Sequence, residues 1–226
     1  MHSVFGYTVT VTPSATTVKP LRRDAQRNRE RLVASARKLF ARDGVDASVV
    51  EITRDAGVGM GTLYRHFPTK EELIDAVLED AFSDIVGAAE QAVANDDAWA
   101  GLVGFVEHVL GLHAVNRGMK DMLATRERGA ERAEAMRDRI RPLMRRLIAR
   151  AQEQGKLRAD FAPEDLAVLF WTGGRVIETT AAIAPDHWRR FLGLLLDGMR
   201  AESASPLPAP PLTRIQLARA QRRRAA

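Results

Sequence analysis

The strongest constraint on the fold is a run of helix signals within residues 44–73, GVDASVVEITRDAGVGMGTLYRHFPTKEEL. Ser48 and Glu51 form a capping-box pattern, in which hydroxyl and carboxylate satisfy free backbone amides, so a short helix should begin directly after Ser48. Gly57 suits the left-handed conformation that ends a helix, and only a tight turn then precedes a second helix over Met60–Phe67. The segment therefore predicts two short helices joined by a tight turn.

The second helix has two distinct faces when its residues are placed at about 100° each. Met60, Leu63 and Phe67 share an apolar face. Tyr64 falls on the boundary, where its ring can cover the core while its hydroxyl reaches outward. The opposite face carries Gly61, Thr62, Arg65 and His66. A polar and basic outer face of this kind suits DNA.

A third helix is expected immediately afterwards, because Thr69 and Glu72 repeat the capping-box pattern. Lys70 takes its first position, and a basic side chain beside a helix N-terminus is well placed for phosphate. Upstream, residues 24–43 are expected to form an amphipathic helix that packs on the motif and ends at Gly44. Its apolar residues recur at helical spacing: Leu32, Val33, Ala36, Leu39 and Phe40.

Residues 44–73 closely resemble the DNA-binding motif of the tetracycline-repressor (TetR) family of bacterial transcriptional regulators, in which GTLYRHFPTKEEL is nearly a signature string. The resemblance is specific over residues 24 to about 80. Beyond them it rests on chain length, an all-helical pattern and the position of the motif near the N-terminus. It implies that the helix over Met60–Phe67 enters the major groove of DNA.

The resemblance also implies roles for individual residues. Ser48 would touch a phosphate from the preceding helix. The residues expected to approach base edges or nearby phosphates are Gly61, Thr62 and Arg65. Those expected to grip the DNA backbone are Tyr64, His66 and Lys70. The alternative for Tyr64 and His66 is that they are ordinary surface residues of an interaction helix.

Two positions depart from the family pattern. Thr53 stands where the family commonly has alanine, and Gly59 stands where a serine or threonine usually caps the recognition helix. Glycine is itself a fair N-cap, costing a few tenths of a kcal/mol relative to serine, so we expect the fold to survive while the hydroxyl that could bind a phosphate is missing. The string GVGMG at 57–61 could instead be a nucleotide-binding loop, but such a loop must follow a buried strand, and EITRDA is a polar helical run.

Composition limits the class of protein. The chain has 226 residues, 46% of them apolar, which is enough for one large or two modest domains. The absence of cysteine excludes a disulfide scaffold and fits a reducing cytoplasm, where we expect the protein to lie. No apolar run approaches the roughly 18 residues that span a membrane, so no membrane contact is expected. The start of the chain lacks signal-peptide features and indicates a flexible leader, although YTVTVT could form a strand.

Basic character is concentrated at the two ends and in the motif. The net charge of +5 divides into +3 over residues 1–23, +3 over 24–70, −6 over 71–206 and +5 over 207–226. The acidic middle is expected to stay clear of DNA and to turn the motif toward the phosphates. The arginine-rich tail could contact DNA or remain solvated. The same two possibilities hold for the early arginines Arg22, Arg23, Arg27, Arg29 and Arg31.

We therefore expect an all-α fold, with an N-terminal three-helix helix-turn-helix DNA-binding domain and a larger helical domain for ligand binding and dimerisation. Pro142 is expected to kink or divide the helix that contains it, and Pro163 with the acids after it indicates a helix start. The expected domains are a leader at 1–20, the DNA-binding domain at 21–70, the larger domain at 71–203 and a disordered tail at 204–226. The helices expected in the larger domain lie near 70–94, 97–114, 118–125, 129–154, 163–183 and 186–201.

The resemblance implies that the last two long helices form a four-helix bundle with their mates in a homodimer. The sequence is compatible, because these segments carry more apolar residues than one helix pair alone need bury. A two-fold dimer also suits the reading of a near-palindromic operator, since one recognition helix touches few base pairs.

A small-molecule site is expected in the larger domain, where a mixed aromatic and polar set is typical of ligand pockets. The candidate lining residues are Trp99, Phe105, His108, Met119, Met122, Trp171 and Arg175, each of which could equally belong to the core. Catalysis finds no support, and no cofactor or metal is expected. His108 and His113 diverge by about 140° on a helix and do not make a metal pair.

The sequence as a whole indicates a dimeric transcriptional regulator, which we expect to be a repressor that binds a palindromic double-stranded operator and is released or modulated by a small-molecule effector. Thermodynamic linkage supplies the mechanism. A ligand that binds better to a dimer with misaligned recognition helices increases the population of that dimer, so the ligand weakens DNA binding and DNA weakens ligand binding by the same factor. One alternative is an architectural DNA binder without an effector. Another is a helical enzymatic or ligand-binding domain whose basic ends aid solubility.

Overall fold

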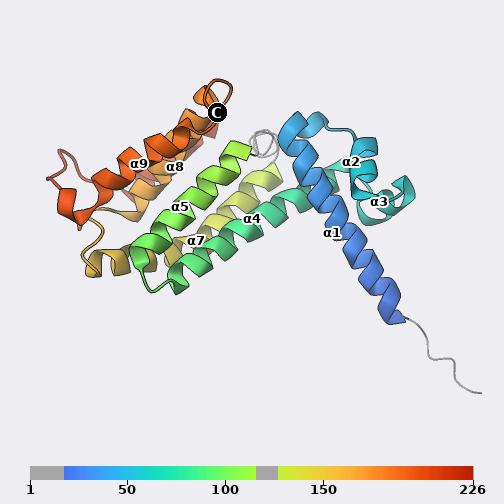
Figure 1. Cartoon of the computed structure of the whole chain (residues 1–226), viewed down its shortest axis with the longest axis horizontal. Coiled ribbons are helices and arrows are strands. Elements are labelled where there is room, and N and C mark those ends of the chain that lie inside the picture. Colours follow the sequence, from blue (N-terminus) through green and yellow to red (C-terminus); the bar gives the residue numbers. More distant parts are fainter. Residues whose placement is uncertain (1–17, 116–126, 226) are drawn as a thin grey trace, which may run out of the picture.

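The structure is a computed structural model of the whole chain, and it describes residues 18–115 and 127–225. Over these ranges the chain is helical, without a named strand, which confirms the expected all-α fold (Figure 1). The expected helix near 118–125 and most of the expected leader lie outside the described residues. The α-helices are α1 (Val18–Asp43), α2 (Val49–Ala56), α3 (Met60–His66), α4 (Lys70–Ala94), α5 (Ala98–Val115), α7 (Glu127–Glu153), α8 (Pro163–Thr180), α9 (His187–Met199) and α10 (Arg214–Ala225). The 3-10 helices are η1 (Gly44–Asp46) and η2 (Ala201–Ser203).

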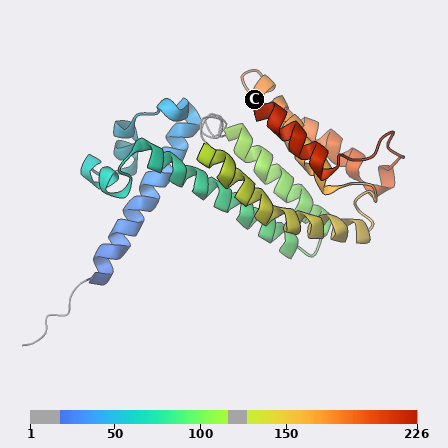
Figure 2. The ribbon, with the colours of Figure 1, turned by 180° about the vertical axis from the view of Figure 1, so that it is seen from behind.

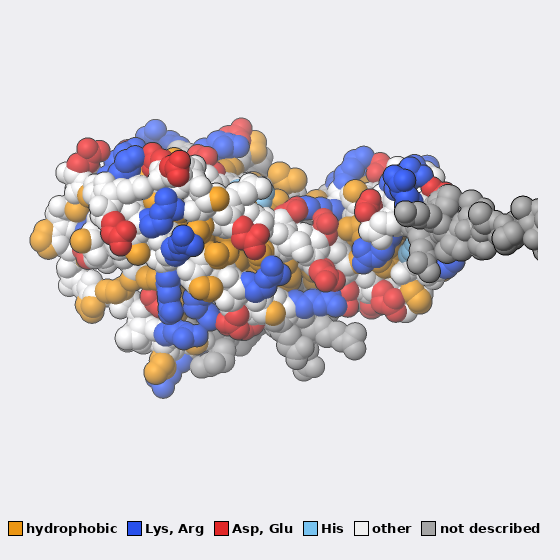
Figure 3. Space-filling view, turned by 90° about the horizontal axis from the view of Figure 1, so that it is seen from below, with side chains coloured by type: hydrophobic (Ala, Val, Ile, Leu, Met, Phe, Trp, Pro, Cys, Tyr) orange, Lys and Arg blue, Asp and Glu red, His pale blue; other side chains and the backbone are white. Residues whose placement is uncertain are grey.

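Helix α4 joins two hydrophobic cores. Its first half, from Leu73 to Phe82, packs with α1, α2 and α3, while its second half, from Ile85 to Ala92, packs with α5, α7, α8 and α9. Figures 1 and 2 show α4 running from the small unit of α1–α3 at one end of the molecule into the larger helical unit. On the face seen from below, acidic and basic side chains are interspersed over both units (Figure 3).

Helix starts agree with the sequence signals, but one cap differs. Thr69 caps α4 as expected, because its hydroxyl accepts a hydrogen bond from the Glu72 amide at 3.2 Å. Helix α2 also begins directly after Ser48, yet the Ser48 side chain makes no cap hydrogen bond. The Glu51 carboxylate lies 3.3 Å from the Arg42 guanidinium and is therefore drawn to α1, which removes the reciprocal half of the expected box.

Helix α7 is not divided at Pro142, which leaves a kink as the effect expected there. Two other helices differ from expectation. Helix α1 begins at Val18, several residues earlier than the expected helix. The tail, expected to be disordered, contains α10. Its start is explained by Thr213, whose hydroxyl accepts from the Gln216 amide at 3.3 Å, and by the Gln216 side chain, which accepts from the Thr213 amide at 2.8 Å. This Thr-x-x-Gln box was a sequence signal that the compositional argument overlooked.

Helix α5 corrects one expectation. By length and composition, α5 is apolar enough to cross a membrane, which the expectation of no long apolar run had excluded. Glycine, alanine and histidine separate its large apolar residues, so no continuous run of large apolar residues is visible in the sequence. The mean hydropathy of the helix is nevertheless that of a spanning segment. Its large side chains, among them Leu102, Phe105 and Leu110, belong to the core of the larger unit, so burial within the protein accounts for its apolar composition.

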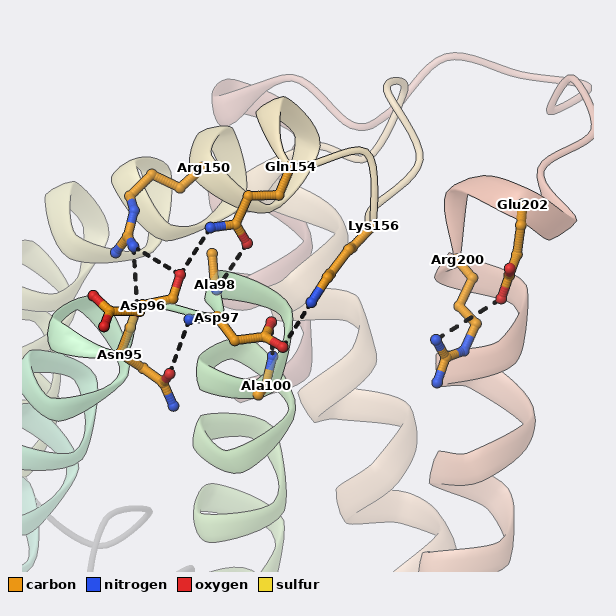
Figure 4. A network of polar contacts seen from close by, with 10 residues as sticks. All are labelled: Asn95, Asp96, Asp97, Ala98, Ala100, Arg150, Gln154, Lys156, Arg200 and Glu202. Atoms are coloured by element: carbon orange, nitrogen blue, oxygen red, sulfur yellow. Dashed lines mark hydrogen bonds and ion pairs between the residues drawn. The ribbon is translucent and has the colours of Figure 1, made fainter.

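The turn between α4 and α5 is held to the end of α7 by a polar network (Figure 4). The Arg150 guanidinium donates to the carbonyl oxygens of Val93 at 2.6 Å, Asn95 at 3.0 Å and Asp96 at 3.3 Å. Alongside it, the Lys156 ammonium donates to the Asp97 carboxylate at 2.7 Å and lowers the pKa of that carboxyl. Arg150 thus satisfies backbone acceptors where α4 ends and the next helix begins.

We expect the Arg150→Met substitution to lower the free energy of unfolding by about 2 kcal/mol, because it removes the donor from the partly buried Val93 carbonyl while keeping an aliphatic stem of similar length. Urea unfolding followed by circular dichroism measures the change. Arg146→Met is the matched control, since Arg146 is exposed one turn earlier on α7 and should change stability by less than about 0.5 kcal/mol. Equal effects of the two substitutions would contradict the role given to Arg150.

Candidate nucleic-acid interface

Helix α3 is fixed from beneath by its apolar side. Leu63 is 1% exposed and Phe67 is 3% exposed, and both belong to the core that α1, α2 and α4 share. The turn before α3 has the expected geometry, since Gly57 has a φ of +63° and its amide donates to carbonyls of α2. Helix α3 is therefore presented by a rigid base, and its other side is left for a partner.

Two buried hydroxyls connect the elements of this unit. The Ser35 hydroxyl of α1 donates to the Ile52 carbonyl of α2 at 2.9 Å. The Thr53 hydroxyl donates to the Val50 carbonyl at 2.9 Å and lies 3.4 Å from the Met60 sulfur. Threonine at position 53 is thus accommodated without an unsatisfied polar group, and it contacts the first residue of α3.

The expected DNA-contact residues lie on the outer side of this unit. Gly61 and Arg65 are exposed, and Tyr64 is 49% exposed despite its position at the edge of the apolar face. An added Cβ at Gly61 would meet no atom within 4 Å, so the backbone of α3 is open to close approach at that point. Thr62 and His66 are half-buried. Two further candidates lie at helix starts, with Ser48 exposed before α2 and Lys70 half-buried at the first position of α4.

His66 differs from the simple picture of a phosphate-binding imidazole. Its Nε2 is buried and has no hydrogen-bond partner among the described residues. Burial lowers the pKa of His66, and the charges of Arg65 and Arg29 lower it further. The neutral imidazole is therefore favoured, and Nε2 cannot reach a phosphate unless the side chain rotates or the contact comes from the other ring nitrogen.

Two arginines that the sequence indicated as part of a charged arm contact the motif instead. The Arg29 guanidinium lies 5.3 Å from the centre of the Phe67 ring. The Arg31 guanidinium lies so close to Gly57 that an added Cβ there would be 2.6 Å from its Nη2. No sequence signal distinguished these two arginines from Arg23 or Arg27, because their partners follow roughly thirty residues later in the chain.

Ion pairs leave the outer side of α3 with free positive charge. Lys38 pairs with Asp55 at 2.6 Å, and Arg42 pairs with Asp43 and Glu51. Arg65 and Lys70 make no ion pair with any residue of the described ranges. Uncompensated charge beside a protruding helix favours a polyanionic partner.

The residues expected to line a ligand pocket do not gather in one place. Trp99 is 7% exposed in the core beneath the Arg200 guanidinium, whereas Arg175 is exposed and pairs with Glu178 at 3.3 Å. Trp171 is half-buried on α8, and Met119 and Met122 lie outside the described residues. Of the described candidates, Phe105 and His108 share a hollow, an open groove of about 620 Å³ between α4 and α5. We call this the α4–α5 groove, and its walls include Asp84, Gly87, Gln91, Gly104, Phe105 and His108.

Comparisons with known proteins agree with this architecture. A family model described as bacterial regulatory proteins of the tetR family matches residues 32–77. A second, described as the C-terminal domain of SbtR-like transcriptional regulators, matches residues 97–201. The crystal structure of a TetR transcription regulatory protein from Mycobacterium vanbaalenii is 32% identical, with a TM-score of 0.63 over 80% of this chain and 99% of that one. The chain belongs to the TetR family.

Other members of the TetR family give the same result. The crystal structure of the TetR transcriptional regulator SCO0520 from Streptomyces coelicolor is 27% identical, with a TM-score of 0.62 over 76% of this chain and 98% of that one. HTH-type transcriptional regulators of Staphylococcus aureus are 45% identical over 60 residues, which cover 26% of this chain. The match spans about a third of the length of those curated relatives, 32%. The chain is thus a TetR-family helix-turn-helix regulator, a member of a family of transcriptional regulators rather than enzymes.

The pKa of His66 can be tested on the protein alone. We expect NMR titration to give a value below the ordinary 6.5, and we expect Arg65→Ala to raise it partly, because burial is the larger cause and remains. Since the folded state disfavours the imidazolium, His66 should reduce the stability of the unit as the pH falls below about 6.5. The control is Arg54→Ala, whose charge is not among the causes. An equal response of His66 to both substitutions would contradict the assignment.

Proposed function

We propose that the protein is a repressor that binds a palindromic operator as a homodimer and is released or modulated by a small-molecule effector. The observation that carries the proposal is the exposed face of α3, with Gly61, Tyr64 and Arg65 outward and Leu63 anchored beneath. Arg65 is suited to base edges or phosphates, whereas Tyr64 and Lys70 are suited to the DNA backbone. We further propose that Ser48, Thr62 and His66 complete this contact, and that the protein acts in the cytoplasm.

Dimerisation through α8 and α9 is supported by apolar side chains that the single chain leaves uncovered. Leu194 on α9 is 63% exposed, and Ile183 in the turn between these helices is 88% exposed. Trp171 and Phe191 are half-buried on the same two helices. A second copy that packs its own α8 and α9 on this surface would bury these side chains in a four-helix bundle.

Effector control is supported by the position of α4. Because α4 contributes to both cores, a ligand that shifts its second half must also move its first half and the helices packed there. In a dimer, this movement would change the separation of the two α3 helices. A ligand that binds the misaligned dimer better must weaken DNA binding by the same factor.

DNA binding is tested by fluorescence anisotropy with labelled DNA from beside the gene itself, with scrambled competitor DNA. We expect tight binding that survives the competitor and a footprint with two-fold symmetry. Weak binding shared equally by all sequences would contradict an operator-binding role and would favour attraction by the basic ends alone.

Lys70→Ala should weaken binding to every DNA sequence and reduce the slope of log K against log salt by about one unit, because the variant no longer neutralises one phosphate of the DNA backbone. The same anisotropy assay over a salt titration measures this slope. Lys38→Ala is the matched control, since Lys38 is already paired with Asp55. If the slope of the Lys70→Ala variant equals that of the wild type, Lys70 does not bind a phosphate.

Leu194→Glu should convert the dimer to a monomer, because it introduces a charge into the proposed bundle. Light scattering after gel filtration measures the mass, and operator affinity should fall by at least about tenfold because a monomer reads a single half-site. Leu207→Glu is the control, since Leu207 is 51% exposed outside α8 and α9. A Leu194→Glu protein that remains dimeric would place the dimer contact elsewhere.

A further inference from the structure

The α4–α5 groove reaches the junction of the two cores. Its wall begins near Asp84, where α4 passes from one core to the other, and extends to Asn95 at the end of α4. The glycines make it wide, because an added Cβ at Gly87 or Gly104 would meet no atom within 4 Å. The groove of about 620 Å³ is therefore large enough for a small organic molecule.

The far end of the groove is rigid. An added Cβ at Gly101 would lie 2.4 Å from the Ala92 carbonyl oxygen, so α4 and α5 are in close contact there. Asn95 belongs to the turn that Arg150 holds against α7 (Figure 4). A molecule in the groove can therefore act on the structure more easily at the other end, which is lined by Asp84.

Among the described residues that line the groove, the charged side chain is that of Asp84. Asp84 supplies a carboxylate, Gln91 and Asn95 supply amides, and neither lysine nor arginine is among the described residues that line it. The aromatic ring of Phe105 and the imidazole of His108 form the opposite wall on α5. A carboxylate at one end of a partly aromatic groove is complementary to a cation with a flat apolar body.

Asp84 also connects the groove to the small unit of α1–α3, which we call the DNA-reading unit. Its carboxylate accepts from the Arg37 guanidinium of α1 at 2.5 Å, and the same Arg37 nitrogen lies 3.0 Å from the Asp80 carboxylate. One guanidinium thus faces two carboxylates, and these three groups together carry one net negative charge. A second cation could bind there only by sharing Asp84 with Arg37.

We propose that the α4–α5 groove binds an organic amine, whose ammonium group pairs with Asp84 in competition with Arg37 while its apolar body lies against Phe105. The inference rests on the proposed function and names the class and the site of the effector. When an amine occupies the groove and pairs with Asp84, Arg37 keeps Asp80 as its partner, and the contact between α1 and α4 becomes weaker. The DNA-reading unit is then held less firmly at the angle that a dimer needs.

The size of this coupling is modest. The Arg37 and Asp84 side chains are 24% and 44% exposed, and ion pairs at such positions contribute little to stability. We therefore expect a saturating amine to reduce operator affinity by about threefold, and operator DNA to reduce amine affinity by the same factor.

Tryptamine is a suitable probe, and tryptophol, which replaces its ammonium group with a hydroxyl, is the neutral control. Isothermal titration calorimetry on the full chain without DNA should show that tryptamine binds at least about tenfold more tightly than tryptophol. Asp84→Asn should abolish this preference. Asp80→Asn should keep it, because Asp80 pairs with Arg37 but does not line the groove.

Two further variants test competition and location. Arg37→Gln should increase tryptamine affinity severalfold, because it removes the competitor for Asp84. Gly104→Leu should block binding by filling the groove, whereas Gly111→Leu on the same helix should not, since Gly111 lies outside the groove and also has open space for a side chain. Circular dichroism melting shows that each variant is folded.

The outcomes separate this inference from the proposed function. The amine site would be overturned if tryptamine does not bind, if tryptophol binds equally well, or if the Asp84→Asn protein keeps its preference for tryptamine. In each of these cases operator binding could still support a repressor. Amine binding that follows the expected pattern in a protein without sequence-specific DNA binding would leave the site standing and refute the repressor.

Discussion

The structure depends on one helix that serves two cores. The first half of α4 closes the core of the DNA-reading unit, and its second half closes the core of the larger unit. Apolar burial is non-directional, so either core alone would tolerate some rotation of its neighbour. Helix α4 is continuous through both cores, and α7 also reaches the first core through Ala133, so this freedom is restricted. The ion pairs of Arg37 with Asp80 and Asp84 reinforce the connection on the surface.

The small unit and the larger unit are stabilised in different ways. In the small unit, buried hydroxyls such as Ser35 and a tight glycine turn fix helices that are close in sequence. In the larger unit, long side chains such as Arg150 bridge residues 57 positions apart. The outer face of α3 is therefore rigid locally, while its position relative to the rest of the molecule depends on α4. This arrangement suits a regulator whose DNA contacts are constant and whose geometry is adjustable.

Much of the fold could be predicted from the sequence, because helix signals are local. The start of α2 after Ser48, the end at Gly57 and the full span of α4 follow from caps and apolar periodicity. The TetR family followed from the motif at residues 44–73, and the all-α class followed from the helical pattern along the chain. The DNA-contact residues remain predictions, although the structure does place Gly61, Tyr64 and Arg65 on the outside of α3.

The sequence by itself determined where α2, α3 and α4 begin, because capping and periodicity act over one or two turns. Only the tertiary structure decided which side chains meet across long separations. It placed Arg29 on Phe67, it buried Nε2 of His66, and it separated Trp99 from the groove that Phe105 lines. These contacts depend on how helices pack against one another, and the pattern within a single helix does not specify its neighbour.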